Sequence, residues 1–382
     1  MKKVIYLVAL LIGFWSCKEG DDGSMVLQPV KITALDGLPS DSVVFIGTPI
    51  KMVAKIENPL SATYEWSYSG KVISREARVE FTPITQGRQQ IVLLVNNAIS
   101  EQKISADFYV FRPHGEKSSK WISKIIEYRP APGQFVNTDL GNLSAAQGLI
   151  GKRGVVSLGG YGGYIVWQFD HTVVNKAGTD FVVHGNAFEG NSEPGIVMVA
   201  YDKNGNGLPD EQEWFELRGS EWDKSTKGYS ITYTKPEQTT SAQDVPWSDS
   251  KGGKGVVSAI GFHKQCYYPL FLDEESLSLT FTGNVVPKNA TANANGIWTL
   301  ATLKGGYVDN YSEDYAKSVA GDEQTLRSNK FDIDMAVDKD GKRVVLPGVD
   351  FIKVYNCING QAGWLGEIST EVCGAISLST AQ

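Results

Sequence analysis

Short apolar runs recur along this chain, some rich in β-branched residues and others alternating with polar residues. Such runs occur at 43–46, 50–56, 91–95, 163–169, 181–184, 196–201, 229–233 and 277–281. Gly, Asn and Pro residues separate them, and patterns with the helical period are scarce. Alternation with a period of two is typical of β-strands that bury one face, whereas a helix repeats its apolar residues every three to four positions. We therefore predict an all-β fold.

Residues 27–112 form the first predicted domain. The segment Tyr64–Tyr68 alternates around Trp66, and turn pairs such as Asn58-Pro59 and Ser69-Gly70 separate the strands. This order resembles that of PKD-like domains with the immunoglobulin fold, in which a Tyr-x-Trp strand supplies the core aromatic residue. The resemblance implies an Ig-like sandwich with Trp66 in its core. Modules of this kind usually act as spacers.

The rest of the chain forms a second, larger predicted domain. Residues 113–119 are polar and rich in turn formers, and we interpret them as a linker. Residues 120–382 contain short strand-like runs separated by Gly and Asn turns, which favours a jelly-roll-like β-sandwich. No internal repeat of about 20 to 50 residues is visible, which argues against propellers and solenoids.

The N-terminus has the layout of a bacterial lipoprotein signal. Lys2 and Lys3 precede the apolar run Val4–Trp15, and Ser16 precedes Cys17. The run is too short to span a bilayer of roughly 30 Å as a helix. We expect residues 1–16 to be removed and Cys17 to carry the lipid, with residues 17–26 as an acidic tether. An ordinary secretory signal is the alternative.

Charge and composition exclude some partners. The chain has 36 basic and 43 acidic residues, for a net charge of −7, and it lacks a basic block. Phosphate backbones are bound by clustered Lys and Arg, so nucleic acid is not an expected partner. No second apolar stretch approaches membrane length. A lipid on Cys17 is then the expected membrane anchor.

Three cysteines remain besides Cys17. We expect one disulfide between Cys357 and Cys373, which are close in sequence, and a free thiol at Cys266. Three unrelated buried thiols are the alternative, and the two interpretations stay open at this stage.

A sharp local motif occupies residues 202–213 and fits a calcium-binding loop. Its oxygen ligands would be Asp202, Asn204, Asn206, the Leu208 carbonyl, Asp210 and Glu213. Ca²⁺ prefers six to eight oxygens, and this spacing wraps them around one point. Gly207 permits the sharp turn. We predict a structural Ca²⁺ ion that holds a long loop together, and a calcium-free Asx turn is the alternative.

Aromatic residues gather around this loop in sequence. The candidates for a ligand-stacking face are Tyr161, Tyr164, Trp167, Trp214, Trp222, Trp247, Tyr267 and Tyr268. Glycines around 159–163 would leave ring faces open, which suits a flat ligand. Burial of these rings in the sandwich core is the alternative.

The sequence lacks a familiar catalytic motif. Asp170, His171 and His184 suggest parts of a catalytic dyad, but no nucleophile lies in a Gly-x-Ser-x-Gly setting and there is no His-Glu-x-x-His. Paired carboxylates for glycoside cleavage cannot be singled out among 43 acids. We therefore predict a binding protein rather than an enzyme.

A larger resemblance runs through residues 120–380. Its ordered motifs lie at 128–137, 157–165, 185–188, 192–197, 202–217, 350–354 and 366–372. Together they are similar to the C-terminal domain of a family of Bacteroidetes cell-surface lipoproteins that is often joined to PKD-like domains. The acidic segment Lys18–Asp22 resembles the tag that sends such lipoproteins to the outer cell face, and Asp41-Ser42-Val43 resembles their O-glycosylation motif at Ser42.

The family resemblance also implies a function. Some members accompany TonB-dependent uptake systems, including those for vitamin B12. We therefore expect a protein anchored to the outer membrane and facing the exterior, which binds a corrinoid and passes it to a TonB-dependent transporter. A surface glycan receptor is the alternative within the same class. A glycan-cleaving enzyme and an adhesin are the alternatives from other classes.

Overall fold

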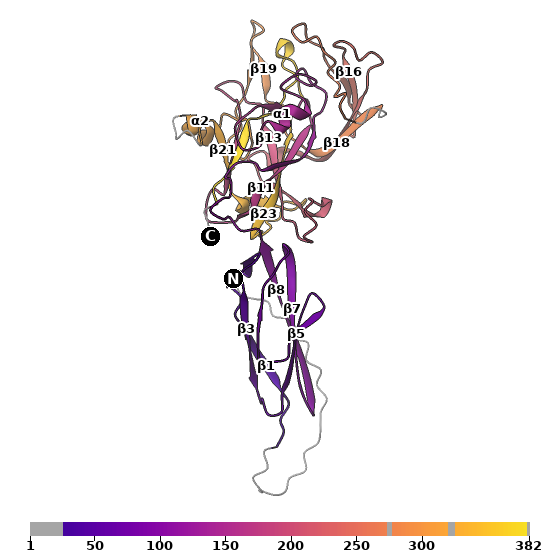
Figure 1. The fold of residues 1–382 in the computed structure, drawn as a ribbon. Helices are drawn as coiled ribbons and strands as arrows, with labels where there is room; N and C mark the ends of the chain where they lie inside the picture. The colour runs from indigo at the N-terminus through magenta and orange to yellow at the C-terminus, as the bar shows by residue number, and fades with distance from the viewer. Residues whose placement is uncertain (1–25, 273–276, 320–324, 380–382) are drawn as a thin grey trace. The chain divides into compact units, whose positions relative to one another are not determined.

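The computed structural model describes residues 26–272, 277–319 and 325–379 (Figure 1). The signal segment, Cys17 and nearly all of the tether lie outside these residues. These residues divide into two compact units, one formed by 26–112 with 203–205, and one formed by 113–202 with the described residues from 206 to 379. Within the described residues, no helix has the length and apolar content needed to cross a membrane.

The first unit is a sandwich of two sheets. One sheet has the order β1-β3-β6, with strands Lys31–Asp36, Ile50–Glu57 and Arg78–Phe81. The other has the order β2-β8-β7-β4-β5, with strands Val43–Phe45, Ser100–Phe111, Gly87–Asn97, Thr63–Tyr68 and Lys71–Ser74. Trp66 is fully buried between them, and its indole N–H donates to the Glu76 carbonyl at 3.0 Å. Residues on alternate positions of β3 point into this core, as the sequence pattern predicts.

The second unit is built around a six-stranded sheet with the order β22-β14-β13-β23-β11-β9. Its strands are Ala336–Val337, Trp214–Leu217, Gly195–Ala200, Gly348–Asn356, Tyr164–Val174 and Lys124–Arg129. A three-stranded sheet, β21-β12-β25, consists of Ser328–Phe331, Phe181–His184 and Gly374–Ser377. Side chains of both sheets share one hydrophobic core, which includes Trp167, Ile352, Phe181 and Ala375. These two sheets therefore form a sandwich.

Smaller sheets and short helices complete this unit. A four-stranded sheet, β17-β16-β15-β18, contains Lys254–Val257, Val245–Asp249, Thr226–Thr234 and Ser278–Val285. Two-stranded sheets pair β10 (Val156–Ser157) with β24 (Glu371–Val372), and β19 (Ala290–Ala292) with β20 (Trp298–Leu300). The helices are α1 (Leu143–Gln147), α2 (Glu313–Val319) and the 3-10 turns Glu211–Glu213, Trp222–Lys224, Ile333–Met335 and Gly363–Leu365. The prediction of an all-β chain of sandwiches is confirmed.

The expected disulfide is not formed. Cys266, Cys357 and Cys373 are free and buried. The Cys357 thiol donates to the Pro194 carbonyl at 2.9 Å and belongs to a different hydrophobic cluster from that around β25. A sandwich of this size buries enough apolar surface to be stable without a covalent link.

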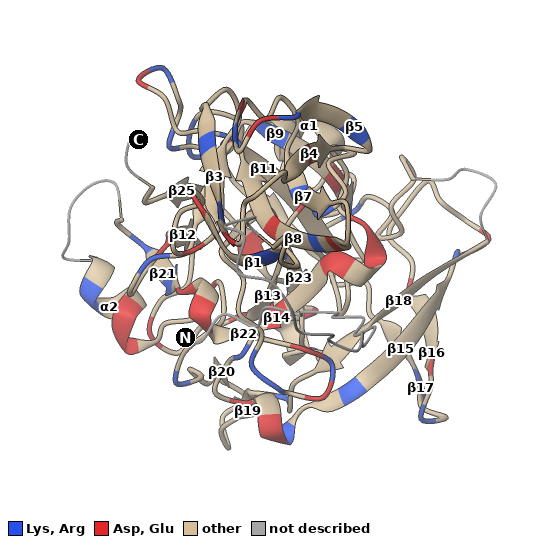
Figure 2. Cartoon of the chain, turned by 90° about the horizontal axis from the view of Figure 1, so that it is seen from below, with Lys and Arg blue, Asp and Glu red and all other residues tan. Residues whose placement is uncertain are grey.

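Acidic and basic residues are interspersed along the described ribbon (Figure 2).

Ser42, the expected glycosylation residue, lies in the turn before β2, where its N–H donates to the Pro39 carbonyl at 3.0 Å. Its side chain is partly exposed.

Candidate ligand-binding site

The structure places most of the expected stacking residues in the core. The buried ones, with at most 6% of their surface exposed, are Tyr161, Trp167, Trp222, Tyr267 and Tyr268. Trp167 lies on β11, a central strand that is covered on both faces, so alternation does not expose it. These five rings offer no open face to a flat ligand.

Three of the expected aromatics are partly exposed, namely Tyr164, Trp214 and Trp247. The Lys353 ammonium lies 4.0 Å from the centroid of the Tyr164 ring, so this ring already has a cation–π partner. Trp247 is different, because it lines a pocket. We therefore take the pocket around Trp247 as the candidate site.

The pocket has a volume of about 160 Å³ and lies against the four-stranded sheet. It is lined by Gly160, Tyr161, Tyr233, Trp247, Val256, Val257, Lys288, Asn359, Gly360, Gln361 and Glu367. Trp247 lies on β16, between two neighbouring strands. It is paired with Tyr233 of β15 on one side and with Gly255 of β17 on the other. A Cβ atom at Gly255 would lie 2.5 Å from the Trp247 ring, so a larger residue there would force the indole to move.

Hydrogen bonds fix the aromatic wall of the pocket. The Tyr233 hydroxyl donates to the Tyr161 carbonyl at 3.0 Å, and the Tyr161 hydroxyl donates to the Tyr229 carbonyl at 3.3 Å. The Asn359 amide donates to the Tyr229 hydroxyl at 2.8 Å, and this hydroxyl donates to Asp249 at 2.8 Å. These hydrogen bonds hold the tyrosine side of the pocket in place before a ligand arrives, which lowers the entropic cost of binding.

Glu367 supplies a buried acid to the same pocket. It is 3% exposed, its Oε1 accepts from the Gln134 N–H at 2.7 Å, and its Oε2 has no hydrogen-bond partner among the described residues. Burial raises the pKa of Glu367 to about 8. Lys288 is exposed and also lines the pocket. An unpaired buried oxygen is costly, so a ligand that hydrogen-bonds to Glu367 would recover this energy.

Sequence reasoning missed Glu367, Asn359 and Lys288. Asn359 and Lys288 lie outside any recognisable motif, and the separation of all three residues from Trp247 along the chain conceals their proximity. The segment 366–372 was notable only as part of the family resemblance.

The expected calcium loop closes on itself through hydrogen bonds. The Asp202 carboxylate accepts from the Asn206 N–H at 3.0 Å and from the Gly207 N–H at 2.8 Å. The Asn206 amide donates to Asp210 at 3.1 Å, and Glu213 accepts from the Asp210 N–H at 3.2 Å. This arrangement is an Asx turn followed by a capping box.

The expected ligands of this loop differ in exposure. Asn204, Asn206 and Leu208 are exposed, whereas Asp202 and Glu213 are buried. Hard oxygen ligands of this kind suit Ca²⁺, and their types and spacing fit the ion. Calcium binding stays a prediction.

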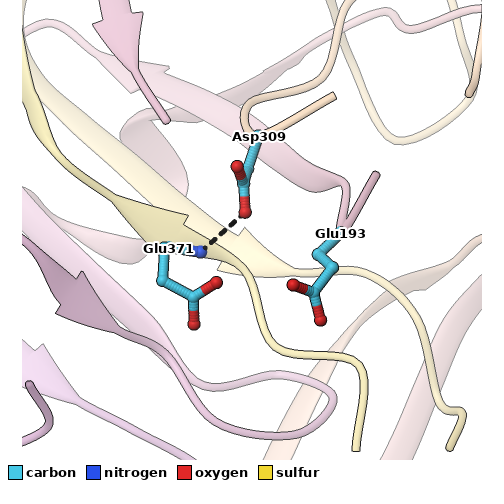
Figure 3. A group of neighbouring side chains, drawn as sticks. All are labelled: Glu193, Asp309 and Glu371. Atoms are coloured by element: carbon cyan, nitrogen blue, oxygen red, sulfur yellow. Dashed lines mark hydrogen bonds between the residues drawn. The ribbon is translucent and has the colours of Figure 1, made fainter. Parts of the chain in front are cut away.

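A second acidic group joins residues that are far apart in sequence (Figure 3). Among the described residues, Glu193, Asp309 and Glu371 are the three acids with ligand atoms all within 4.8 Å of one another. Asp309 accepts from the Glu371 N–H at 3.0 Å and from the Ala187 N–H at 2.8 Å. Burial raises the pKa of Asp309 to about 7, and burial together with the neighbouring acids raises the pKa of Glu193 and of Glu371. Burial and mutual repulsion therefore both oppose full ionisation of this group.

Comparisons with known proteins give distant similarities. No family model and no curated protein matches the chain. One solved structure is described as the structural basis for the promiscuous specificity of carbohydrate-binding modules from the β-sandwich superfamily. It is 10% identical to this chain, with a TM-score of 0.24, and the alignment covers 92% of this chain and 97% of that one. A SusE-like protein is 7% identical, with a TM-score of 0.25. The alignment covers 90% of this chain and 96% of that protein's chain.

A third similarity is to fibronectin(III)-like modules of CbhA from Clostridium thermocellum. It has 13% identity and a TM-score of 0.18 over 59% of this chain and 88% of that one. Similarities at this level carry no argument about function, so the function has to be argued from the site.

Proposed function

We propose that this chain is a surface-exposed lipoprotein that binds one sugar unit of a glycan in the pocket around Trp247. The observation that carries the proposal is the pocket itself, a small cavity that combines a partly exposed indole with several polar side chains. Sugar rings have an apolar face of C–H groups and an edge of hydroxyls. They are therefore complementary to an aromatic ring surrounded by hydrogen-bonding groups.

The size of the pocket distinguishes the two ligands expected from the sequence. A volume of about 160 Å³ is below the range of roughly 300–1,000 Å³ that holds drug-sized ligands. A single sugar ring is compatible with it, whereas a corrinoid macrocycle is too large. Five of the eight stacking rings expected from the sequence are buried, so these eight rings do not form the broad aromatic face that would suit a corrin.

The cellular location in this proposal rests on the sequence. The lipoprotein signal and Cys17 imply an anchor in the outer membrane, and the acidic tether implies the exterior face. A role for the first unit as a spacer follows from its resemblance to PKD-like domains. Delivery of the ligand to a TonB-dependent transporter is implied by the family resemblance and is part of the proposal.

A glycan array followed by calorimetry on the full chain tests the proposal. We expect saturable binding to at least one glycan, and we expect Trp247→Ala to weaken it at least 10-fold, which corresponds to about 1.4 kcal/mol. Trp214→Ala is the matched control, because Trp214 is also partly exposed but lies on β14, outside the pocket. Cobalamin is measured in parallel as the alternative ligand.

Two results would contradict the proposal. Binding that is equally sensitive to both substitutions would remove the pocket from the recognition surface. Saturable binding of cobalamin, together with no binding to any glycan on the array, would restore the corrinoid interpretation.

A further inference from the structure

A Ser–His–Asp chain of hydrogen bonds joins the two main sheets of the second unit. Asp170 and His171 are neighbours on β11, and Ser377 is the last residue of β25. His171 Nδ1 lies 2.7 Å from Asp170 Oδ1, and His171 Nε2 lies 2.8 Å from Ser377 Oγ. His171 and Ser377 are buried, whereas about a third of the Asp170 side chain is exposed.

The charge on Asp170 fixes the direction of these hydrogen bonds. Burial opposes ionisation of Asp170, but hydrogen bonds from the Ser119 N–H and from His171 outweigh it, so the pKa of Asp170 is lowered. An ionised carboxylate only accepts, so His171 Nδ1 must donate to it. In the neutral ring Nε2 then carries the lone pair and accepts from the Ser377 hydroxyl. This is the tautomer that a general base needs.

Ser377 lines a groove of about 540 Å³ on the second unit. Trp121 and Leu378 give the groove apolar surface, and His114 and Ser379 contribute polar groups. Two of these polar atoms, His114 Nδ1 and Ser379 Oγ, are buried and have no hydrogen-bond partner within the part of the chain that the structure describes. The Ser379 N–H donates to Ser377 Oγ at 3.2 Å, which holds the Ser379 backbone beside the serine.

We propose that this groove is an esterase site in which Ser377 is the nucleophile, His171 is the general base and Asp170 positions His171. Ser377 Oγ attacks the ester carbonyl carbon, while its proton moves to His171 Nε2. The bond from the carbonyl carbon to the alcohol oxygen breaks, and the alcohol leaves with the proton from His171. Water then attacks the acyl-serine and gives a proton to His171. The bond to Ser377 breaks, the acid leaves and the serine recovers its proton.

The groove also favours a class of substrate. The unpaired Ser379 hydroxyl is the candidate donor to the carbonyl oxygen as it becomes negative. One hydroxyl stabilises this charge less than a pair of backbone N–H groups does. An ester, whose alcohol leaves more readily than an amine, therefore suits the site better than an amide. The acyl chain would be short and would lie against Trp121 or Leu378. This activity does not depend on the proposed glycan pocket.

A fluorophosphonate probe and p-nitrophenyl acetate test the proposal on the full chain. We expect the probe to form an adduct that mass spectrometry locates at Ser377, and we expect ester hydrolysis above the background. Ser377→Ala and His171→Gln should each lower the rate at least about 100-fold. Asp170→Asn should lower kcat without raising KM, because Asp170 acts on His171 and not on the substrate.

Controls separate chemistry from folding. Ser123→Ala is the matched control, since the Ser123 hydroxyl also contacts β11, through the Gln168 carbonyl at 3.1 Å, but lies outside the groove. Ser377→Cys reports access, because iodoacetamide should alkylate this thiol in the folded protein faster than the three buried native thiols. Alkylation of Ser377→Cys in the folded state, without a probe adduct on the wild-type serine, would overturn the proposal. Failure of iodoacetamide to alkylate Ser377→Cys would overturn it as well.

Discussion

Replacement of Glu367 by Gln should change how the stability of the second unit depends on pH. Burial raises the pKa of this acid from an ordinary value of 4.5 to about 8. The folded state thus binds the proton more tightly than the unfolded state. The contribution of Glu367 to stability is then fully present below about pH 4.5 and is lost as pH rises through about 8.

The size of this effect follows from the pKa difference. Each pKa unit corresponds to about 1.36 kcal/mol, so the loss between pH 4.5 and pH 9 is at most about 5 kcal/mol, and water that enters the pocket will reduce it. Gln keeps the shape of the side chain and an oxygen that can accept from the Gln134 N–H, and it does not titrate. The wild type should therefore lose stability relative to Glu367→Gln as pH rises.

Urea unfolding at pH 5, 7 and 9, followed by tryptophan fluorescence, measures this difference. Glu189→Gln is the control, because Glu189 is exposed. The other buried acids, such as Asp309 and Glu371, titrate in both proteins and cancel in the comparison. A difference between wild type and Glu367→Gln that is the same at pH 5 and pH 9 would refute the reasoning.

Three further predictions concern the loop, the anchor and the thiols. If the loop 202–213 binds calcium, a chelator should lower the melting temperature, because at a calcium concentration 100 times Kd the bound ion contributes about 2.7 kcal/mol of stability. Asp202→Ala should abolish this sensitivity, and an unchanged melting temperature with chelator would contradict the calcium site. Cys17→Ala should leave the protein outside the membrane fraction, and extraction that still depends on detergent would count against lipidation. Iodoacetamide without reductant should alkylate Cys266, Cys357 and Cys373 only after denaturation, whereas a pair protected under denaturing conditions would indicate a disulfide.

The period of the hydrophobic pattern was sufficient to predict the architecture. In β3 and β6 one face is buried and the other is exposed, so alternation along the sequence reports directly on the core. The core position of Trp66 was implied by the resemblance of its Tyr-x-Trp strand to PKD-like domains, and the structure buries this residue between the two sheets of the first unit. Local chemistry also follows from local sequence, as in the Asx turn and capping box of residues 202–213.

Exposure and proximity within the second unit were decided by the tertiary structure alone. β11 is a central strand with neighbours on both sides and cover on both faces, so its sequence cannot show that Trp167 is buried and has no ring face free for a ligand. The three acids of Figure 3, the pocket that joins Trp247 to Glu367, and the contact of His171 with Ser377 across 206 residues all arise from sheets that bring distant segments together. The sequence supplied the types of side chain, and only the packing of the sheets determined which of them meet, because a side chain's partners depend on long-range contacts that no local period encodes.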